Sequence, residues 1–415
     1  MTRNLLTADQ TAKRLGVKVD TVYAYVSRGI LTRTVAEDGR TSRFDPREVD
    51  ELFRRGRPRQ DRGRQGAVQV SLATDITRLA DGELSYRGHP VAALVGSATF
   101  ETVAELLWTG RLPAHSDAGA WTVPTAAARL GAAVSAALPR QSPVIERLTA
   151  VTAALAGGDP LRVDRRPEAV ARVGRTLIGT YVHVLGPAPR GTGRRAGDPT
   201  GNRATGAHRR TAAALWPKLS PLPATRPRVR VLDAALVLLA DHELAASTLA
   251  ARVAASTRAD PYATVGAALG AVAGPLHGTT ATAVHRMLLD AARSADPAGA
   301  TAVAATAGRL PGFGHVVHQH GDPRAGILLD RLATICPRPV RRVVDTVFRT
   351  AQDLGAGAPN MDAAMAAMAL AADMPVGATD ALFPVARTAG WLAHTLEEYG
   401  ETALRFRARA VYTGP

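Results

Sequence analysis

Apolar residues recur every three or four positions along most of the 415-residue chain, which is the spacing of one face of an α-helix. Residues 99–110 follow this pattern, with Phe100 and Val103 one turn apart, and 231–255 and 361–368 repeat it. Glycine and proline interrupt these runs and mark the turns between helices. The pattern therefore predicts a mainly α-helical protein.

Residues 1–56 have the pattern of a small separate domain. Thr7 is a suitable N-cap for a first helix, and a second helix is expected over 21–27. Residues 45–48 predict the start of a third helix, because they supply a capping Asp, a Pro at the first position and a Glu at the third. The Asp-Gly pair at 38–39 favours a tight hairpin turn, so a short β-wing is expected before the third helix.

This order of helices and wing resembles the winged helix-turn-helix of mercury-resistance-type regulators and excisionases. The resemblance implies that the second helix enters a DNA major groove while the wing contacts phosphate. The candidate DNA contacts are Lys18, Thr21, Tyr23, Tyr25, Arg28, Arg40 and Arg43. The alternative is a protein-interaction or relic domain, because one such module alone has little affinity for DNA. Residues 57–67 are rich in Arg and Gly and are expected to form a linker.

Three segments bounded by glycine or proline carry polar residues between the apolar helices. They are AGPLHG at 273–278, GFGH at 312–315 leading into DPR at 322–324, and PNMD at 359–362. Helix interiors disfavour glycine and proline, so these segments are expected to be turns. Such turns let backbone amides approach a ligand and hold a side chain at a fixed angle. The segments are therefore candidates for a binding or catalytic site.

In this order, the three segments resemble the active-site segments of citrate synthases. The likeness continues in ADHEL at 240–244, in ARTAGW at 386–391 and in the tail at 407–414. Residues 81–88, predicted to form a β-hairpin, resemble the entry segment of that family. The resemblance covers about 68–415.

What the resemblance implies is a two-domain, mainly α citrate-synthase-like fold preceded by the winged helix-turn-helix domain. The large domain is expected to comprise 68–256 and 361–415, and the small domain 257–360. The site is expected in a cleft that closes over its ligands. In that family the position of Arg407 reaches the neighbouring subunit's site, so a homodimer is implied.

The implied reaction is the condensation of an acyl-CoA with a 2-oxo acid. A base must remove a proton from the carbon beside the thioester, and Asp362 is the candidate. A hydrogen-bond donor must stabilise the enolate oxygen, for which His277 is suited, and His315 is the candidate donor to the 2-oxo group. This chemistry requires no metal, and no cofactor is expected besides acetyl-CoA as a substrate.

A dicarboxylate such as oxaloacetate requires cationic partners, and arginine provides a permanent charge with two parallel donors. By the resemblance, Arg324, Arg387 and Arg407 bind the carboxylates and His242 adds a hydrogen bond. Taken alone, each position has a structural interpretation: His242 as a core histidine, Asp362 as a helix-start residue and Arg407 as part of a solvated tail. The ordered set of motifs favours the functional interpretation.

Three positions beside these segments depart from the family pattern. Thr279 stands where the family has a second glycine after GPLHG. The loss of this glycine is expected to restrict how closely the backbone approaches the thioester or CoA. Residues 316–319 are Val-Val-His-Gln where the family often has Arg-Val-Tyr-Lys. Two cations for the CoA phosphates are thus missing, and His318 and His320 are expected to replace them in part. Residues 363–366 are small where bulkier or polar residues are usual.

The formal net charge of +15 is concentrated, with +6 in residues 1–67 and +9 in 186–230. Only three of the 51 basic residues are lysine, which fits GC-rich coding and weakens the case for nucleic-acid binding by the whole chain. Residues 186–227 lack apolar periodicity and are expected to form a flexible surface insertion, with a contact to nucleic acid or an acidic partner as the alternative. Cys336 is the only cysteine, which excludes an intrachain disulfide and fits a reducing cytoplasm. No apolar run is long enough to span a membrane.

Three functional hypotheses follow. The first is a citrate synthase that uses acetyl-CoA and oxaloacetate. The second is the same chemistry with propionyl-CoA, as in 2-methylcitrate synthase, which the small residues after Asp362 favour. The third is a non-catalytic regulator that senses CoA esters or dicarboxylates and positions DNA-binding domains.

Overall fold

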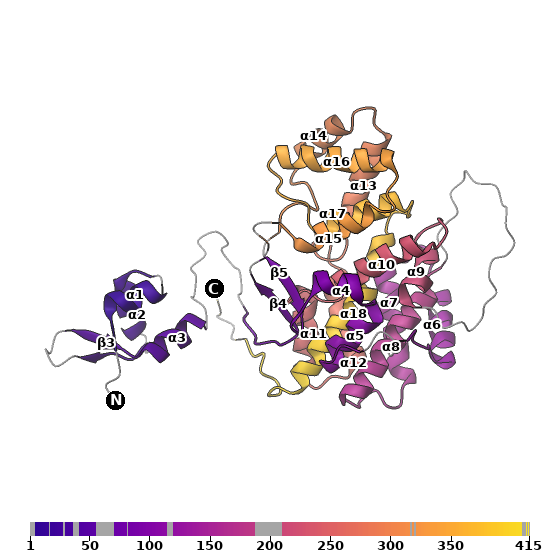
Figure 1. The fold of residues 1–415 in the computed structure, drawn as a ribbon. Helices are drawn as coiled ribbons and strands as arrows, with labels where there is room; N and C mark the ends of the chain where they lie inside the picture. The colour runs from indigo at the N-terminus through magenta and orange to yellow at the C-terminus, as the bar shows by residue number, and fades with distance from the viewer. Residues whose placement is uncertain are drawn as a thin grey trace, which may run out of the picture. The chain divides into compact units, whose positions relative to one another are not determined.

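The computed structural model confirms a mainly helical protein (Figure 1). It describes residues 5–15, 17–27, 30–35, 41–54, 70–80, 82–113, 119–186, 210–315, 318, 321–408, 412 and 414. The chain divides into two compact units, Met1–Leu72 and Ala73–Pro415. Among the described helices, none is long and apolar enough to cross a lipid bilayer.

The smaller unit contains three helices and a three-stranded sheet. Its elements are β1 (Leu6–Thr7), α1 (Ala8–Leu15), α2 (Val19–Ser27), β2 (Thr34–Val35), β3 (Ser42–Phe44) and α3 (Pro46–Arg54). β3 pairs antiparallel with both β1 and β2, so the strands of the expected wing are confirmed. The expected cap of α1 is confirmed too: the Gln10 N–H donates to Thr7 Oγ1 at 3.2 Å, and the Thr7 N–H donates to Gln10 Oε1 at 2.9 Å.

Two side chains of this unit lie elsewhere than expected. Tyr25, a candidate DNA contact, is only 7% exposed and belongs to the core with Val22 and Phe44, so that prediction was wrong. Three-residue spacing places Tyr25 on the same face of α2 as the buried Val22. The Glu48 carboxylate, expected to help cap α3, instead accepts hydrogen bonds from the Thr32 N–H and hydroxyl, both at 3.0 Å. Glu48 therefore ties the segment before β2 to α3.

The larger unit begins with a small sheet and continues as helices. Its strands are β4 (Thr77–Ala80), β5 (Glu83–Tyr86) and β6 (His89–Pro90). The expected hairpin is confirmed, because β4 pairs antiparallel with β5 and Leu79 lies opposite Leu84. The helices are α4 (Val91–Ser97), α5 (Phe100–Thr109), α6 (Thr125–Ala137), α7 (Val144–Gly158), α8 (Pro167–Val184), α9 (Thr211–Leu219), α10 (Arg226–Leu239), α11 (Ala246–Ser256), α12 (Pro261–Val272), α13 (Thr280–Arg293), α14 (Pro297–Thr306), α15 (Pro323–Leu332), α16 (Arg338–Asp353), α17 (Met361–Ala371) and α18 (Ala378–Tyr399).

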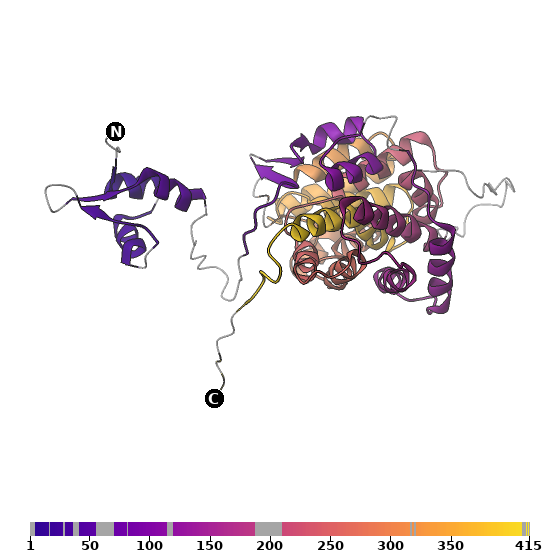
Figure 2. The same ribbon diagram turned by 90° about the horizontal axis from the view of Figure 1, so that it is seen from below.

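Helix α18 runs through the middle of the larger unit, with α5, α8, α10, α11 and α12 packed around it (Figures 1 and 2). Its closest approach to the chain after α10 is at Gly390, whose N–H donates to the Ala240 carbonyl at 3.0 Å. A Cβ at position 390 would lie 2.3 Å from Asp241 Oδ1, so this contact requires glycine. The approach also brings Arg387, one turn earlier on α18, to the end of α10.

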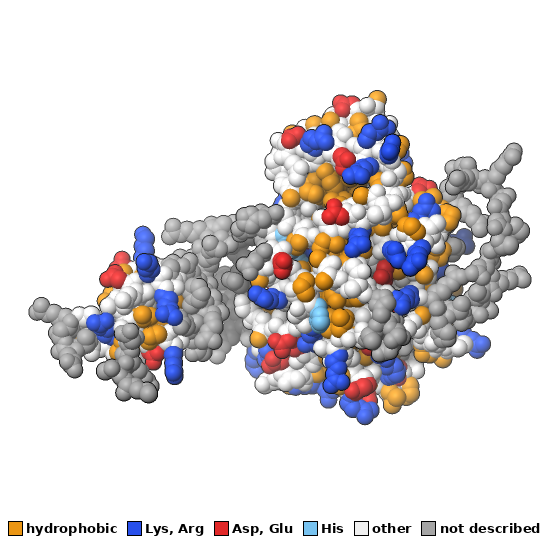
Figure 3. All heavy atoms as spheres, in the orientation of Figure 1, with side chains coloured by type: hydrophobic (Ala, Val, Ile, Leu, Met, Phe, Trp, Pro, Cys, Tyr) orange, Lys and Arg blue, Asp and Glu red, His pale blue; other side chains and the backbone are white. Residues whose placement is uncertain are grey.

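Helices α13–α17 form a second group at one end of the larger unit (Figure 1). Within this group α17 packs mainly against α13 and α15, while α15 also meets α10. The expected bounds of a large and a small domain stay a prediction. On the face drawn in Figure 3, the Lys and Arg side chains of the larger unit are interspersed with Asp and Glu and do not gather in one patch.

The prediction of a flexible insertion at 186–227 is wrong for the C-terminal part of that segment. Residues 211–219 form α9, and α10 already starts at Arg226. Trp216 on α9 is fully buried, and its indole N–H donates to the Leu222 carbonyl at 2.8 Å. Residues 187–209 lie outside the described residues.

Replacement of Gly390 by alanine is expected to lower the free energy of unfolding by about 1–3 kcal/mol, because the added methyl group overpacks the contact between α18 and the end of α10. Urea unfolding followed by circular dichroism measures the change. The control is Gly326→Ala on the exposed side of α15, where a Cβ meets no atom within 4 Å and alanine is expected to be neutral or stabilising. Equal stability of the Gly390→Ala variant and the wild type would contradict the close contact.

Candidate active site

Six of the seven expected site residues lie at element ends or on α18 in the larger unit. His242 follows α10, His277 lies in the turn between α12 and α13, His315 precedes α15, Arg324 is in the first turn of α15, Asp362 is in the first turn of α17, and Arg387 is on α18. The charge of Arg387 perturbs the pKa values of His242, His277 and Asp362. The residues therefore share one electrostatic environment.

His277 is oriented by a chain of two hydrogen bonds. The indole N–H of Trp391 donates to Ser247 Oγ at 3.1 Å, and Ser247 Oγ lies 2.8 Å from His277 Nε2. An indole N–H can only donate, so Ser247 Oγ accepts from Trp391, but a hydroxyl oxygen has a second lone pair and this bond alone does not set the direction of its contact with Nε2. The Ser247 backbone N–H donates to Nε2, at 3.4 Å. Nε2 is therefore an acceptor, and a neutral His277 carries its proton on Nδ1.

The neutral form of His277 is the stable one at neutral pH. Burial lowers the pKa of this histidine to about 4, and the nearby Arg387 charge acts in the same direction. The ring also meets Phe383 edge-to-face, with 5.6 Å between centroids. Phe383 in turn lies under the guanidinium of Arg387, whose central carbon is 4.6 Å from the ring centroid. Phe383 thus connects His277 with Arg387.

Asp322 and Arg324 form a buried ion pair at the start of α15. Arg324 donates from Nε to Asp322 Oδ1 at 2.9 Å and from Nη2 to Oδ2 at 2.7 Å. Asp322 Oδ2 also accepts a hydrogen bond from the backbone N–H of Met361, at 3.1 Å. Met361 is the first residue of α17. Burial acts to raise the pKa of Asp322, but the hydrogen bonds and charge of Arg324 outweigh it and hold that pKa below its usual value. The pair therefore joins α15 to the helix that carries Asp362.

Asp362 has an environment suited to a base. Its helix is capped by the Asn360 side chain, whose Oδ1 accepts the Asp362 N–H at 2.9 Å and the Ala363 N–H at 3.4 Å. Burial raises the pKa of Asp362 to about 6, although Arg324 acts to lower it. A carboxyl group with a pKa near 6 is ionised at neutral pH and is a stronger base than an exposed aspartate.

Three histidines gather around the end of α10. His242 Nε2 lies 2.9 Å from His318 Nε2, and the ring centroids of His242 and His315 are 5.3 Å apart. The ring centroids of His315 and His318 are 4.7 Å apart, and the backbone N–H of His318 donates to His315 Nδ1 at 3.3 Å. His242 is followed by Glu243, whose φ of 50° is unusual for a residue other than glycine and turns the chain sharply after the histidine. Burial is the main cause that lowers the pKa of each of the three imidazoles.

Arg387 is the buried cation that these groups surround. It is 2% exposed, and its Nε donates to the Leu239 carbonyl at the end of α10, at 2.7 Å. Burial lowers the pKa of Arg387 to about 10, partly offset by the charge of Asp241. The guanidinium remains charged at neutral pH. It is therefore a preformed partner for an anion.

Two expected features lie outside this arrangement. Arg407 is exposed on the C-terminal segment, whereas Arg405 two residues earlier pairs with Glu398 through bonds of 2.8 and 2.6 Å. His318, expected to face the phosphates of CoA, is 6% exposed and lies 3.7 Å from Asp322 Oδ1, so that prediction was wrong. His320 lies outside the described residues.

The candidate DNA contacts are spread over the smaller unit. Lys18 and Tyr23 are exposed, while Thr21 and Arg43 are partly buried. Arg28 and Arg40 lie outside the described residues.

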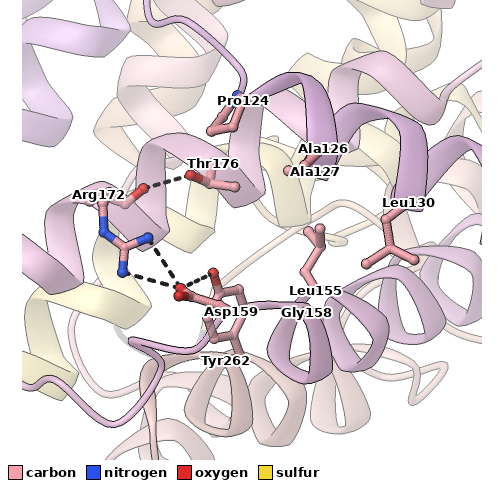
Figure 4. A pocket seen from close by; sticks show the side chains of 10 residues that line it. All are labelled: Pro124, Ala126, Ala127, Leu130, Leu155, Gly158, Asp159, Arg172, Thr176 and Tyr262. Atoms are coloured by element: carbon pink, nitrogen blue, oxygen red, sulfur yellow. Dashed lines mark hydrogen bonds and ion pairs between the residues drawn. The ribbon is translucent and has the colours of Figure 1, made fainter.

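A separate pocket lies between α6, α7, α8 and α12, away from the segments named above (Figure 4). Its cavity volume is about 180 Å³, and its lining includes Leu130, Leu155 and Thr176. The polar groups at its edge are already paired: Asp159 accepts from Arg172 at 3.1 Å and from the Tyr262 hydroxyl at 2.9 Å (Figure 4). The pocket offers no histidine or second carboxylate, so it is not the candidate active site.

Sequence patterns did not single out Ser247, Phe383 or the inward position of His318. Ser247 and Phe383 are ordinary helix residues by type, and only their contacts with His277 distinguish them. For His318 a signal was present, because it is three residues after His315 and replaces an aromatic residue of the family pattern.

Comparisons with known proteins identify the families to which the two units are similar. The family model described as "Citrate synthase, C-terminal domain" matches residues 67–409, and a helix-turn-helix domain model matches 5–57. A citrate synthase of Saccharolobus solfataricus is 30% identical over 380 residues, covering 85% of this chain and 96% of that protein. A 2-methylcitrate synthase of Corynebacterium glutamicum is 27% identical over 363 residues, covering 83% of this chain and 93% of that protein. The solved ternary complex of citrate synthase from Thermoplasma acidophilum with carboxymethyl coenzyme A and oxaloacetate aligns with a TM-score of 0.66 and 25% identity, covering 84% of this chain and 94% of that one.

The raised pKa of Asp362 predicts a stability change with pH. A carboxyl whose pKa is higher in the folded than in the unfolded state favours folding when protonated, so its contribution is lost as the pH rises through about 6. An Asp362→Asn variant stays neutral at every pH. It is expected to be more stable than the wild type at pH 8, by about 2–3 kcal/mol, and to approach it as the pH falls towards 4.

Urea unfolding at a series of pH values measures this difference. Asp290→Asn, at an exposed position of α13, is the control and is expected to follow the wild type throughout. A difference between Asp362→Asn and wild type that is the same at pH 4 and pH 8 would show that burial does not perturb this carboxyl group.

Proposed function

Because the chain belongs to the citrate synthase family, we propose that it condenses an acyl-CoA with oxaloacetate and releases the CoA thiol. The observation that carries this proposal is Asp362, a buried carboxylate with a pKa raised to about 6, in the same electrostatic environment as neutral His277 and cationic Arg387. This combination supplies a base, a neutral donor and an anion partner for the two substrates.

The first step we propose is proton removal from the carbon beside the thioester. Asp362 takes the proton, and the electron pair of the C–H bond moves towards the thioester oxygen. His277 donates from Nδ1 to that oxygen, because Ser247 occupies Nε2 as described above. A neutral imidazole suits this role, since it stabilises the enolate without first having to lose a proton.

The second step is attack of the enolate carbon on the 2-oxo carbon of oxaloacetate. His315 and His242 are the proposed donors to the 2-oxo group and its neighbouring carboxylate, and Arg324 and Arg387 provide the positive charge. A new C–C bond forms, and the former 2-oxo oxygen becomes a hydroxyl group after it gains a proton. Water then cleaves the thioester, giving the tricarboxylic acid and the free CoA thiol.

Arg407 enters this proposal through a second copy of the chain. In its own chain it is exposed and separate from the residues above. We propose a homodimer in which Arg407 binds a substrate carboxylate at the site of the neighbouring copy.

The acyl group is proposed to be acetyl, which makes the product citrate. Relatives of both kinds, citrate synthases and 2-methylcitrate synthases, match the chain at similar identity. Buried alanines follow Asp362 on α17 at positions 363 and 364, and their small side chains are the feature that favours propionyl-CoA as the alternative substrate.

The Asp362→Ala variant is expected to release CoA thiol from acetyl-CoA and oxaloacetate about 10²–10⁴ times more slowly than the wild type, because the base is lost. A thiol reagent follows the reaction, and Asp290→Ala is the control for an exposed aspartate. Oxaloacetate binding, measured by calorimetry, is expected to persist in the variant.

The same assay with propionyl-CoA decides the acyl group. A higher kcat/KM with propionyl-CoA than with acetyl-CoA would favour 2-methylcitrate synthesis. If a folded wild-type protein binds oxaloacetate but turns over neither thioester, the condensation is ruled out and the sensing regulator takes its place.

A second function is proposed for the smaller unit, which is DNA binding by α2 and the strands β2 and β3. The match of a helix-turn-helix model to 5–57 and the exposed Lys18 at the start of α2 support it. A homodimer would present two such units, which raises affinity for a paired site.

The full-length protein is therefore expected to bind duplexes selected from a random DNA pool, with an affinity that falls as salt rises. Lys18→Ala is expected to weaken binding and to reduce the salt slope by about one, as loss of one phosphate contact would. Lys13→Ala, at an exposed position of α1, is the control. Fluorescence anisotropy measures both. Equal binding by Lys18→Ala and wild type, or no dependence on sequence, would contradict this function.

A further inference from the structure

The histidine cluster after α10 has the composition of a metal site. His242, His315 and His318 each offer one ring nitrogen, and these three nitrogens all lie within 4.8 Å of one another. Two of the residues come from the segment before α15 and the third from the end of α10, so the cluster exists only in the folded chain. We propose that these three histidines bind a divalent transition-metal ion of the zinc class.

The distances suit a tetrahedral ion. With Zn–N bonds of about 2.0–2.1 Å, two tetrahedral ligand nitrogens lie about 3.3 Å apart. The Nε2 atoms of His242 and His318 are 2.9 Å apart, a hydrogen-bond distance, and have to separate by about 0.4 Å to hold an ion between them. The third nitrogen, from His315, lies within 4.8 Å of both and reaches the ion by a ring movement on the order of 1 Å. Imidazole nitrogen is a preferred ligand for Zn²⁺, Co²⁺, Ni²⁺ and Cu²⁺.

The backbone positions of the ligands are fixed by neighbouring structure. His242 sits in a short bridge with Leu244, across the left-handed turn at Glu243. His318 is 6% exposed and lies 3.7 Å from the Asp322 carboxylate, which is itself held by Arg324. Preset ligand positions reduce the ordering that an ion must impose.

The surrounding charges are mixed. Arg324 and Arg387 perturb His242 as cations and oppose a bound dication. The Asp322 carboxylate acts in the opposite direction on His315 and His318. The charges around the histidines therefore do not prevent a metal ion from binding. Three protein ligands leave the fourth position of a tetrahedral ion for water or a carboxylate oxygen.

The metal site and the proposed oxaloacetate site share two histidines, and His318 belongs to the metal site alone. His242 and His315 are assigned to oxaloacetate above, whereas His318 stands where the resembled family often has tyrosine. A bound ion would occupy the two shared histidines, so metal and oxaloacetate are expected to compete. That consequence rests on the proposed function, but the metal site itself does not.

Co²⁺ is the probe for the test, because its visible absorption reports nitrogen ligands in a tetrahedral site. Full-length protein freed of metal with a chelator is titrated with Co²⁺, and Zn²⁺ is then added to displace it. One Co²⁺ per chain is expected for the wild type. His318→Tyr is expected to weaken binding at least about tenfold, and so is His315→Gln. His183→Gln, which removes an exposed histidine of α8, is expected to bind as the wild type does.

Each outcome is decisive. Absence of the tetrahedral Co²⁺ spectrum in the wild type, or equal binding by wild type, His318→Tyr and His315→Gln, overturns the metal site. Thermal unfolding identifies a variant that has lost its fold, and the other ligand variant then decides. Oxaloacetate is titrated in parallel: metal binding without thioester turnover contradicts the proposed function alone, and turnover without metal binding contradicts the metal site alone.

Discussion

The geometry of the candidate site depends on one buried carboxylate, that of Asp322. It caps α15, pairs with Arg324 through two hydrogen bonds and accepts the first N–H of α17. A buried ion pair costs desolvation energy, and removing one partner leaves an unpaired charge that destabilises a protein by about 3–5 kcal/mol. The pair therefore fixes the position of Arg324 relative to the helix that begins with Met361 and Asp362, almost 40 residues later in the chain.

The second constraint is the close passage of α18 past the end of α10. It places Arg387 against the Leu239 carbonyl and, through Phe383, beside His277. Burial lowers the pKa values of His242 and His277 and raises that of Asp362, and the charge of Arg387 adds to the first effect and acts against the second. One packing arrangement thus sets the protonation states of Asp362, the histidines and Arg387, because it buries each of these groups and brings their charges close together.

Sequence alone predicted the turns in which most of the candidate site residues stand, because those turns have a distinctive composition. Glycine and proline mark those turns, and His242, His277, His315, Arg324 and Asp362 stand in or beside them. What it missed depends on contacts between segments distant in the chain. The inward position of His318 depends on His242, 76 residues earlier, with which it shares the 2.9 Å contact.

Short elements were the other difficulty. Helix α9 has nine residues and is flanked by Gly-, Pro- and Arg-rich sequence, so its apolar spacing is too brief to stand out, although Ala212, Leu215, Trp216 and Leu219 are all buried. Tyr25 was misplaced because its polar hydroxyl suggested an exposed contact, although its three-residue spacing from Val22 places it on the buried face.

The hydrogen-bond chain from Trp391 through Ser247 to His277 begins at a group that can only donate, because an indole nitrogen has no lone pair with which to accept a proton. This route cannot resupply His277 with a proton, because the indole of Trp391 does not ionise at neutral pH and so cannot replace a proton that Ser247 gives up. A proton that leaves Nδ1 has to be replaced at Nδ1 itself, on the side of the ring away from Ser247.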